Sequence, residues 1–547
     1  MDGGAVIADS QSAEAIVVVV EVVAAEVGVL DWVVVAAEAD DGAEEAVVVG
    51  SGGVVVADEA SVESAEAPDP HATAMMAVAR TGISEERFTS PFSSLLCQKP
   101  AVARRNAIGA GKNYSAGPPD LGETMTDMRA IEAADPAVAG LIRRDLDRQN
   151  SHIHLIASEN FASPAVMEAT GSIFTNKYAE GYPGRRYYEG CEVVDEIETL
   201  AIERARSLFG AEYINVQPHS GAQANMGVYF TLLEPGDTVL GLSLAEGGHL
   251  THGSPVNFSG RLYTFIAYGV DRETERIDMD EVRAKALEHR PKILLAGYSA
   301  YSRHLDYEAF RSIADEAGAL LVVDAAHFIG LVAGKALPNP VPIADVVTAT
   351  THKALRGPRG GMIMSKDDYG PGLNKGVFPD MQGGPIISQI AGKAVCFQEA
   401  STPEFEAYAA QIVANASAMA DTFSAAGVRV VSGGTDNHLL LLDMRSIDDD
   451  LTGKEAATLL DSIGVTLNRN GIPYDPRPPF VTSGLRIGTP AMTTCGMGEE
   501  EAAEVAGLIT AALKDRADEA AVTAVEKKVR AIASEFRPYP EDFPGHV

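Results

Sequence analysis

The stretch that decides the fold is residues 345–361, DVVTATTHKALRGPRGG, in which a short apolar run leads into a single lysine, Lys353. A second run, residues 320–327 with the sequence LLVVDAAH, sets an acid, Asp324, directly after its apolar residues. Buried strands of an open α/β sheet read as such short apolar runs, and these sheets bind ligands at the carboxyl ends of their strands. Both runs therefore predict a strand with a functional side chain at its end.

The two side chains suit one kind of cofactor. A lysine held among hydroxyls and an imidazole at a strand end can be neutral often enough to form a Schiff base with an aldehyde. Pyridoxal phosphate also needs a carboxylate against its pyridine nitrogen, which keeps the ring an electron sink. In isolation, Lys353 is more simply a surface lysine in a turn, and Asp324 the cap of the next helix. Their occurrence together favours the cofactor site.

Outward from these runs, further short apolar stretches alternate with amphipathic helical ones, and this alternation predicts a mostly parallel sheet wrapped by helices. After Pro403 the order of helices and strands changes in a way that fits a smaller α/β domain. We expect an N-terminal arm over residues 123–170, a large cofactor-binding domain over 171–405 and a small C-terminal domain over 406–547. The remaining predicted elements are strands at 213–216, 238–242, 292–298, 428–432, 439–443 and 465–468, a helix at 453–462 and a closing helix from about Glu499.

The arm contains the first convincing helical pattern. Apolar residues recur at helical spacing among charges, which predicts one packing helix over residues 128–148 without visible chemistry. Its apolar residues are Met128, Ile131, Val138, Leu141, Ile142 and Leu146.

The whole chain is acidic, with 43 Lys and Arg against 77 Asp and Glu in 547 residues and a formal net charge of −34. This balance argues against nucleic acid or an anionic membrane as its main partner. Its four cysteines stand far apart with no CxxC or Cys/His cluster, so neither a disulfide framework nor a metal site is predicted. We expect a cytoplasmic protein.

The first 70 residues differ from the rest, because they contain 16 acidic residues and no Lys or Arg. No apolar run there is long enough to span a bilayer, and neither a secretory nor a mitochondrial targeting pattern is present. We interpret residues 1–122 as a low-complexity acidic extension and linker, disordered or not native. The natural chain is expected to start near Met125.

Several longer motifs carry a resemblance to a known family. From about Met125 to Val547 the chain resembles serine hydroxymethyltransferase of the bacterial type, over nearly its whole length. The resemblance implies the aspartate-aminotransferase-like fold of type I pyridoxal phosphate enzymes, with a mostly parallel seven-stranded sheet in the large domain. Besides 345–361, the motifs are LIASEN at 155–160, TNKYAEGYPGRRYY at 175–188, QPHSGAQAN at 217–225, GGHLTHG at 247–253, QGGP at 382–385 and TSGLRIGTP at 482–490.

The resemblance implies roles around the cofactor. Lys353 would form the Schiff base, Asp324 would pair with the pyridine nitrogen, and His249 would stack on the ring. Backbone N–H groups at the start of a helix bind phosphate well, which fits the position of residues 220–222 after a predicted strand. The full set for the cofactor is Lys353, Asp324, His327, His249, Ser220, Gly221, Ala222, Ser299, Tyr178, Arg359, Gly383 and Gly384, of which Tyr178, Gly383 and Gly384 would come from the neighbouring subunit.

It also implies roles toward the substrates. Arg486 would hold the amino-acid carboxylate by a two-pronged contact, and Glu180 would be the acid/base group near the substrate hydroxyl. His352 and Thr350 would tune the lysine and complete the catalytic set. The substrate set is Ser158, Glu180, Tyr187, Tyr188 and Arg486, and the pteridine of tetrahydrofolate would be lined by Leu244, Gly248, His249, Leu250, Pro478, Pro479 and Phe480.

The implied reaction is that of glycine hydroxymethyltransferase, a transferase of one-carbon and amino-acid metabolism. Serine and tetrahydrofolate would give glycine and 5,10-methylenetetrahydrofolate reversibly, in a homodimer with shared active sites or a tetramer of such dimers. An α-methylserine hydroxymethyltransferase would share nearly every residue, and a folate-independent aldolase for 3-hydroxy amino acids is a second alternative. A binding protein without catalysis is disfavoured, because Lys353, Asp324, Glu180 and Arg486 are all present.

Overall fold

The computed structural model describes residues 19–22, 33–38, 44–50, 53–58 and 128–539. The chain divides into two units, Met1–Gly117 and Pro118–Val547. The first contains a four-stranded antiparallel sheet in the order β1-β2-β3-β4. The sequence analysis predicts no regular structure in this segment, whereas the structure has four strands. Their runs of valine explain the difference, because valine favours β-strands. Their bounds are β1 Val19–Val22, β2 Val33–Glu38, β3 Glu44–Gly50 and β4 Gly53–Asp58.

The second unit is built on a seven-stranded sheet in the order β10-β9-β11-β12-β13-β14-β8. Its five strands from β10 to β13 are parallel to their neighbours, whereas β14 runs antiparallel to both β13 and β8. The sheet is therefore mixed. The strands are β8 Tyr213–Asn215, β9 Thr238–Leu242, β10 Thr264–Tyr268, β11 Ile293–Gly297, β12 Leu320–Asp324, β13 Val346–Thr350 and β14 Gly361–Ser365.

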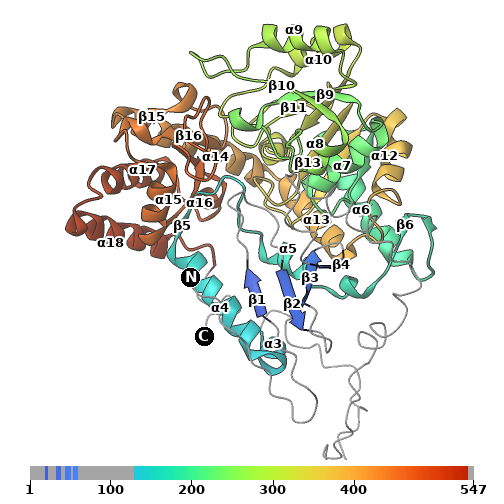
Figure 1. Ribbon diagram of the computed structural model, residues 1–547, viewed down its shortest axis with the longest axis horizontal. Coiled ribbons are helices and arrows are strands. Elements are labelled where there is room, and N and C mark those ends of the chain that lie inside the picture. Colours follow the sequence, from blue (N-terminus) through green and yellow to red (C-terminus); the bar gives the residue numbers. More distant parts are fainter. Residues whose placement is uncertain (1–18, 23–32, 39–43, 51–52, 59–127, 540–547) are drawn as a thin grey trace, which may run out of the picture. The chain divides into compact units, whose positions relative to one another are not determined.

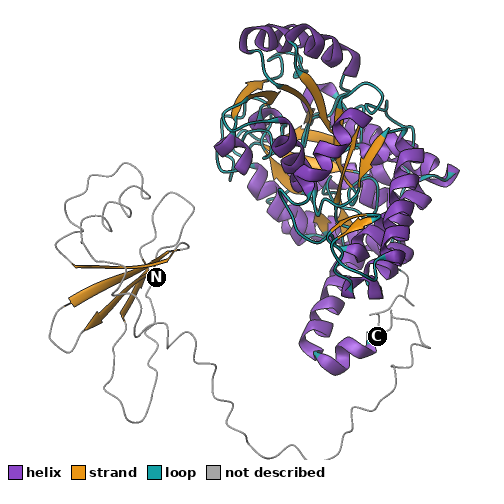
Figure 2. Cartoon of the chain, turned by 90° about the vertical axis from the view of Figure 1, so that its right-hand side faces the viewer, coloured by secondary structure: helices purple, strands orange, loops and turns teal. Residues whose placement is uncertain are grey.

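Helices cover both faces of this sheet (Figures 1 and 2). On β12, Leu321 and Val323 join one buried cluster and Val322 joins another, as the alternation of side chains along a strand requires. The helical elements of this part are α5 Pro164–Thr170, η3 Ile173–Asn176, α6 Glu192–Phe209, α7 Gly221–Leu232, η4 Leu244–Glu246, α8 Phe258–Leu262, α9 Met279–His289, α10 Tyr307–Ala317, α11 Ile329–Ala333, η5 Asp367–Tyr369, α12 Gly370–Val377 and α13 Ile387–Ala400, with a hairpin of β6 Gly181–Tyr182 and β7 Arg185–Arg186.

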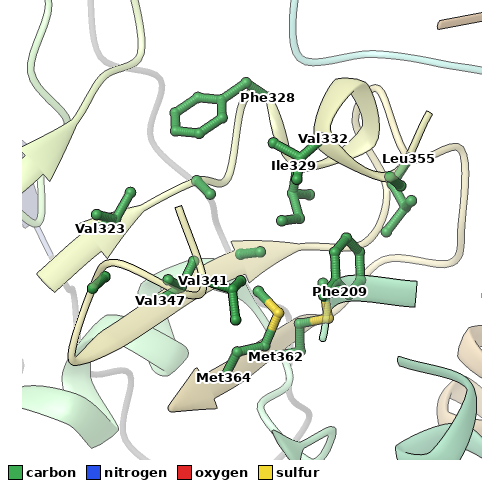
Figure 3. Close-up of a cluster of buried hydrophobic side chains, with 14 of the residues drawn as sticks. Phe209, Val323, Phe328, Ile329, Val332, Val341, Val347, Leu355, Met362 and Met364 are labelled. Carbon is green, nitrogen blue, oxygen red and sulfur yellow. The ribbon is translucent and has the colours of Figure 1, made fainter. Parts of the chain in front are cut away.

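The larger of these clusters supports the turn that carries Lys353. Leu355 is buried in one cluster with Ile329 and Val332 of α11 and Met362 of β14, all of which Figure 3 labels. A Cβ on Gly330 would meet the carbonyl carbon of Ala354 at 2.2 Å, so only glycine lets α11 approach the turn so closely. Packing against a helix thereby fixes the backbone on the carboxyl side of the lysine.

A second core belongs to the C-terminal part. It surrounds a four-stranded sheet in the order β15-β16-β19-β18 and also contains Ile153 and Leu155 from the arm. Helix α14 spans both cores, with Phe405 in the first and Phe423 in the second. The elements are β5 Ile153–His154, α14 Pro403–Ala425, β15 Arg429–Val430, η6 Val431–Gly433, β16 Leu439–Asp443, η7 Met444–Ser446, α15 Gly453–Ser462, β17 Val465–Thr466, β18 Asn468–Asn470, β19 Gly484–Gly488, α16 Pro490–Thr494, α17 Glu499–Lys514 and α18 Glu519–Glu535.

The predicted helix over 128–148 is wrong in two respects. The structure has two helices, α3 Arg129–Ala134 and α4 Pro136–Ser151, because Pro136 cannot continue α3 and Asp135 caps α4 by accepting from the N–H groups of Ala137 and Val138. Among the residues that the structure describes, little covers the apolar face, since only Leu146 of the six residues is buried.

The helices of the described ranges include none that is long and apolar enough to cross a lipid bilayer.

Candidate active site

Lys353 lies in the turn after β13, and the arm fixes its backbone. The side-chain amide of Asn160 donates to the carbonyl oxygen of Lys353 at 3.0 Å and to the hydroxyl of Tyr408 at 2.8 Å. Burial lowers the pKa of Lys353 to about 8, and the charges of Arg486 and Arg359 act in the same direction, although Asp324 opposes them. The amine is therefore neutral in part near physiological pH, as a Schiff-base lysine must be.

Asp324 ends β12 and is almost completely buried, with 5% of its surface exposed. Its Oδ2 accepts from Asn225 Nδ2 at 2.8 Å and lies 3.1 Å from His252 Nε2, while its Oδ1 accepts from the backbone N–H of Ala326. Burial alone raises the pKa of Asp324, but the bond with His252, the neighbouring imidazoles and the Asn225 bond hold it well below its ordinary value. The carboxylate is kept ionised.

Asn225 extends this arrangement to β13 and to the turn that contains Thr251. Its Nδ2 also donates to Thr251 Oγ1 at 2.8 Å, and its Oδ1 accepts from Thr348 Oγ1 at 2.6 Å. Because Thr348 lies on β13 and Asn225 on α7, the bonds connect the elements that carry Asp324 and Lys353. A fully satisfied buried network of this kind holds its members in one geometry.

His249 stands beside this network. Its Nδ1 lies 2.7 Å from Thr251 Oγ1 and accepts from the N–H of Thr251, which fixes the ring. Burial lowers the pKa of His249 to about 4, so the imidazole is neutral. His249, His252 and Asp324 place one potential metal-ligand atom each within 4.8 Å of one another, but the bond between His252 and Asp324 already accounts for that approach. A flat neutral ring here suits stacking on an aromatic cofactor.

The start of α7 forms a cradle. Ser220 is its N-cap and accepts from the N–H of Gln223, and the helix begins at Gly221 as predicted. A Cβ on Gly221 would meet Thr350 Cγ2 at 2.5 Å, so glycine lets the helix start approach the end of β13. Ala222 is exposed in the first turn. The N–H groups of such a turn are the usual binding site for a phosphate.

His327, Ser299 and Arg486 form a further group near Lys353. Arg486 of β19 donates from Nη1 to the carbonyl oxygen of Ser299 at 2.8 Å and from Nε to Asn468 Oδ1 at 3.1 Å. Burial lowers the pKa of Arg486 to about 10, which still leaves it charged. His327 is buried, and its Nδ1 lies 3.3 Å from Nε2 of His438.

A cavity of about 600 Å³ opens beside the lysine turn. Ser158, His352 and Arg359 line it together with the arm residues around Val166. Burial and the adjacent cations lower the pKa of His352 to about 3, and its Nδ1 accepts from the N–H of Gly360 at 3.4 Å. The arrangement brings three predicted residues from the arm and the lysine turn to one hollow.

Tyr178, Glu180, Gly383 and Gly384 form a separate group. Tyr178 donates from its hydroxyl to Glu180 Oε1 at 3.0 Å, and Cβ atoms built on Gly383 and Gly384 would contact the two side chains. Within residues 128–539, no hydrogen bond or ion pair joins this group to Lys353 or Asp324. The structure of one chain therefore brings only part of the predicted site together.

The predicted folate residues remain open to solvent in one chain. Leu244 and Leu250 are each 48% exposed and Phe480 is 80% exposed, and Pro478 and Pro479 are exposed beside it. Tyr187 and Tyr188 are exposed as well. Gly248 is buried, and a Cβ there would meet the carbonyl oxygen of Leu242 at 2.1 Å, so the position admits only glycine. No contact in the described part of the chain tests their role.

Sequence reasoning missed several side chains that hold the site. Asn160, Asn225 and His252 lie inside the quoted motifs, but a polar residue within a motif carries no sign of which distant group it meets. His438 lies directly before β16. The only sign of it in the sequence is its place next to the apolar run of residues 439–442, which predicts a buried strand.

The donor set fits pyridoxal phosphate. The ionised buried carboxylate of Asp324 suits its pyridine nitrogen, and the lysine of lowered pKa suits its aldehyde. The neutral ring of His249 suits the face of its ring, and the helix that starts at Gly221 suits its phosphate. Holding the group would require Asp324, Lys353, His249 and Ser220 to Ala222.

The chain matches the sequence model of a known family. The sequence model described as serine hydroxymethyltransferase matches residues 131–509, which is more than half of the 547 residues.

Proposed function

Because the chain belongs to the serine hydroxymethyltransferase family of pyridoxal phosphate-dependent transferases, we propose that it transfers the hydroxymethyl carbon of serine to tetrahydrofolate. The products are glycine and 5,10-methylenetetrahydrofolate, and the reaction is reversible. The observation that carries the proposal is the proximity of three charged groups. Lys353 lies in the turn after β13, ionised Asp324 ends β12 and Arg486 is in the middle of β19, and the charges of Asp324 and Arg486 both act on the pKa of Lys353. When bound, pyridoxal phosphate supplies an electron sink for the carbon atom next to the amino group.

The chain's own residues bind and orient the substrate. The guanidinium of Arg486 is aimed by its bonds to Ser299 and Asn468 and binds the amino-acid carboxylate. The amine of Lys353 is free to exchange protons near its pKa of about 8. Asp324 stays negative, which favours a protonated pyridine nitrogen beside it.

The proposal also gives a role to Glu180 and the residues around it. We assign Tyr178, Glu180, Gly383 and Gly384 to the site of a neighbouring subunit in a homodimer. Their lack of a bond to Lys353 within the described chain supports this assignment. Glu180 then moves a proton at the substrate hydroxyl, and the exposed Phe480 and Leu250 bind the pteridine once two chains meet. The cytoplasmic location and the bacterial type of the enzyme belong to the same proposal.

An absorbance spectrum of the purified protein, titrated with glycine and then with tetrahydrofolate, tests the proposal. A visible cofactor band that shifts to longer wavelength only when folate is added supports it. A cofactor band without any folate response favours a folate-independent aldolase, and no band after addition of pyridoxal phosphate refutes the enzyme assignment. A comparison of kcat/KM for serine and α-methylserine separates the two hydroxymethyltransferases.

A further inference from the structure

His438 is a buried histidine of the C-terminal part that none of the roles above includes. It lies directly before β16 with 0% of its surface exposed. Its ring and that of His327 meet edge to edge, with an interplanar angle of 25° and centroids 5.5 Å apart, and its Nε2 lies 3.3 Å from His327 Nδ1. The two histidines are 111 residues apart in the sequence and follow or precede strands of different sheets, β12 and β16.

Hydrogen bonds hold the backbone at His438 and the side chain of the preceding residue. Its carbonyl oxygen accepts from the N–H of Thr489 at 3.0 Å. The side-chain amide of the preceding Asn437 donates to the hydroxyl of Tyr298 at 3.1 Å and to the carbonyl oxygen of Tyr301 at 3.0 Å. The segment is therefore tied to the same loop that carries Ser299, so the position of the His438 ring is set by the fold.

Both imidazoles are neutral. Burial lowers the pKa of His438 to about 3 and holds that of His327 well below its ordinary value, and the charges of Lys353 and Arg486 act in the same direction. A hydrogen bond between two neutral imidazoles needs one N–H and one bare nitrogen. The bond thus fixes the tautomer of each ring.

The surroundings of His438 select which ring donates. Its Nδ1 is buried and has no hydrogen-bond partner among the described residues. A proton on Nδ1 would leave a buried N–H without an acceptor, and such groups are rare in folded proteins. A proton on Nε2 avoids this, since that nitrogen faces His327 Nδ1. His438 is then the donor and His327 Nδ1 the acceptor.

We propose that His438 is a positioning residue that fixes His327 as the tautomer with its proton on Nε2. The free nitrogen of His327 is then a hydrogen-bond donor, ready for an anionic oxygen of the bound cofactor such as its phenolate. The inference rests on the proposed function only for the identity of that oxygen. His438 also precedes β16, the strand that pairs with β19, so His438 and Arg486 are held by the same sheet.

The test measures the tautomer directly. The full chain, labelled with ¹⁵N-histidine, is studied by long-range ¹H–¹⁵N correlation spectra with and without pyridoxal phosphate, and the His327 signals are assigned through a His327→Gln variant. We expect His327 to be protonated on Nε2 in the native protein. His438→Leu should mix the tautomers and weaken binding of pyridoxal phosphate about tenfold, whereas His438→Gln, which retains a donor, should restore both.

Asn415→Leu serves as the matched control. Asn415 is equally buried in the C-terminal part and donates to Thr493 and to the carbonyl oxygen of Met497, and neither of these bonds goes to His327 or His438. It should leave the His327 signals unchanged. A native His327 protonated on Nδ1, or the same tautomer and the same cofactor affinity in His438→Leu, overturns the inference. The spectra report the tautomer of His327 without any turnover of substrate. If the proposed reaction is not observed, the result on the tautomer is therefore unaffected, and the two failures can be told apart.

Discussion

Replacing Glu198 with leucine is expected to lower the free energy of unfolding by about 3 kcal/mol. Glu198 is a nearly fully buried acid on α6, with its side chain 1% exposed, and it accepts from Arg186 Nη2 and from Gln217 Nε2, each at 2.7 Å. Arg186 is also buried, with its side chain 3% exposed. Removal of one partner from a buried ion pair costs about 3–5 kcal/mol, because the other charge stays buried. The lower value applies here, since Arg186 keeps its bond to Asp195 at 2.8 Å.

The change should also reach the site. Arg186 Nη1 donates to the carbonyl oxygens of Ala179 and Gly181, which flank Glu180. Without Glu198 the β6–β7 hairpin loses one of its attachments to α6, so we expect kcat to fall along with stability. Glu203→Leu makes the same replacement on an exposed position of the same helix and should change stability by no more than about 0.5 kcal/mol.

Urea unfolding followed by far-ultraviolet circular dichroism measures the effect. Tryptophan fluorescence is unsuitable, because the single tryptophan of the chain is Trp32 in the acidic extension. A double-mutant cycle with Arg186→Met tests the cause: the double variant should lose less than the sum of the two single losses, since no charge is then left buried without its partner. Strictly additive losses, or a loss below about 1 kcal/mol in Glu198→Leu, would refute the reasoning.

Three further results are expected around the cofactor. The rate at which Lys353 binds pyridoxal phosphate should rise about tenfold per pH unit below its pKa of about 8 and level off above it, because only the neutral amine reacts; a rate independent of pH between 6 and 9, measured by stopped-flow absorbance, contradicts this. Asp324→Asn should reduce kcat about 10- to 100-fold, the equivalent of one charged hydrogen bond, with unchanged circular dichroism; an unaltered kcat contradicts the role of the carboxylate. Arg486→Lys should raise KM for serine at least about tenfold while cofactor affinity, measured by equilibrium titration, stays the same, and equal losses in both would point to a structural role.

The strands that carry the chemistry could be predicted from local pattern. The apolar run at 320–324 coincides with β12, and that at 238–242 coincides with β9. The helix over 453–462 and the start of the closing helix at Glu499 also agree with α15 and α17. These segments could be predicted because the spacing of their buried apolar residues is visible within a short window of the sequence.

Other features escaped the pattern. The direction of β14 depends on pairing with β13 and β8, which lies far outside any local window. Helical spacing predicts one helix over 128–148, although Pro136 breaks it in the structure. The exposed apolar face of these helices shows that spacing alone does not say what a helix packs against.

The sequence by itself determined that Lys353 and Asp324 stand at the ends of buried strands, because apolar runs followed by polar residues are a local property of the chain. Only the tertiary structure decided which groups tune them. Asn225 reaches Asp324 across 99 residues and His438 reaches His327 across 111. The order of strands in the sheet and the packing of the C-terminal part against it make these contacts, and they control protonation because water is excluded where they form.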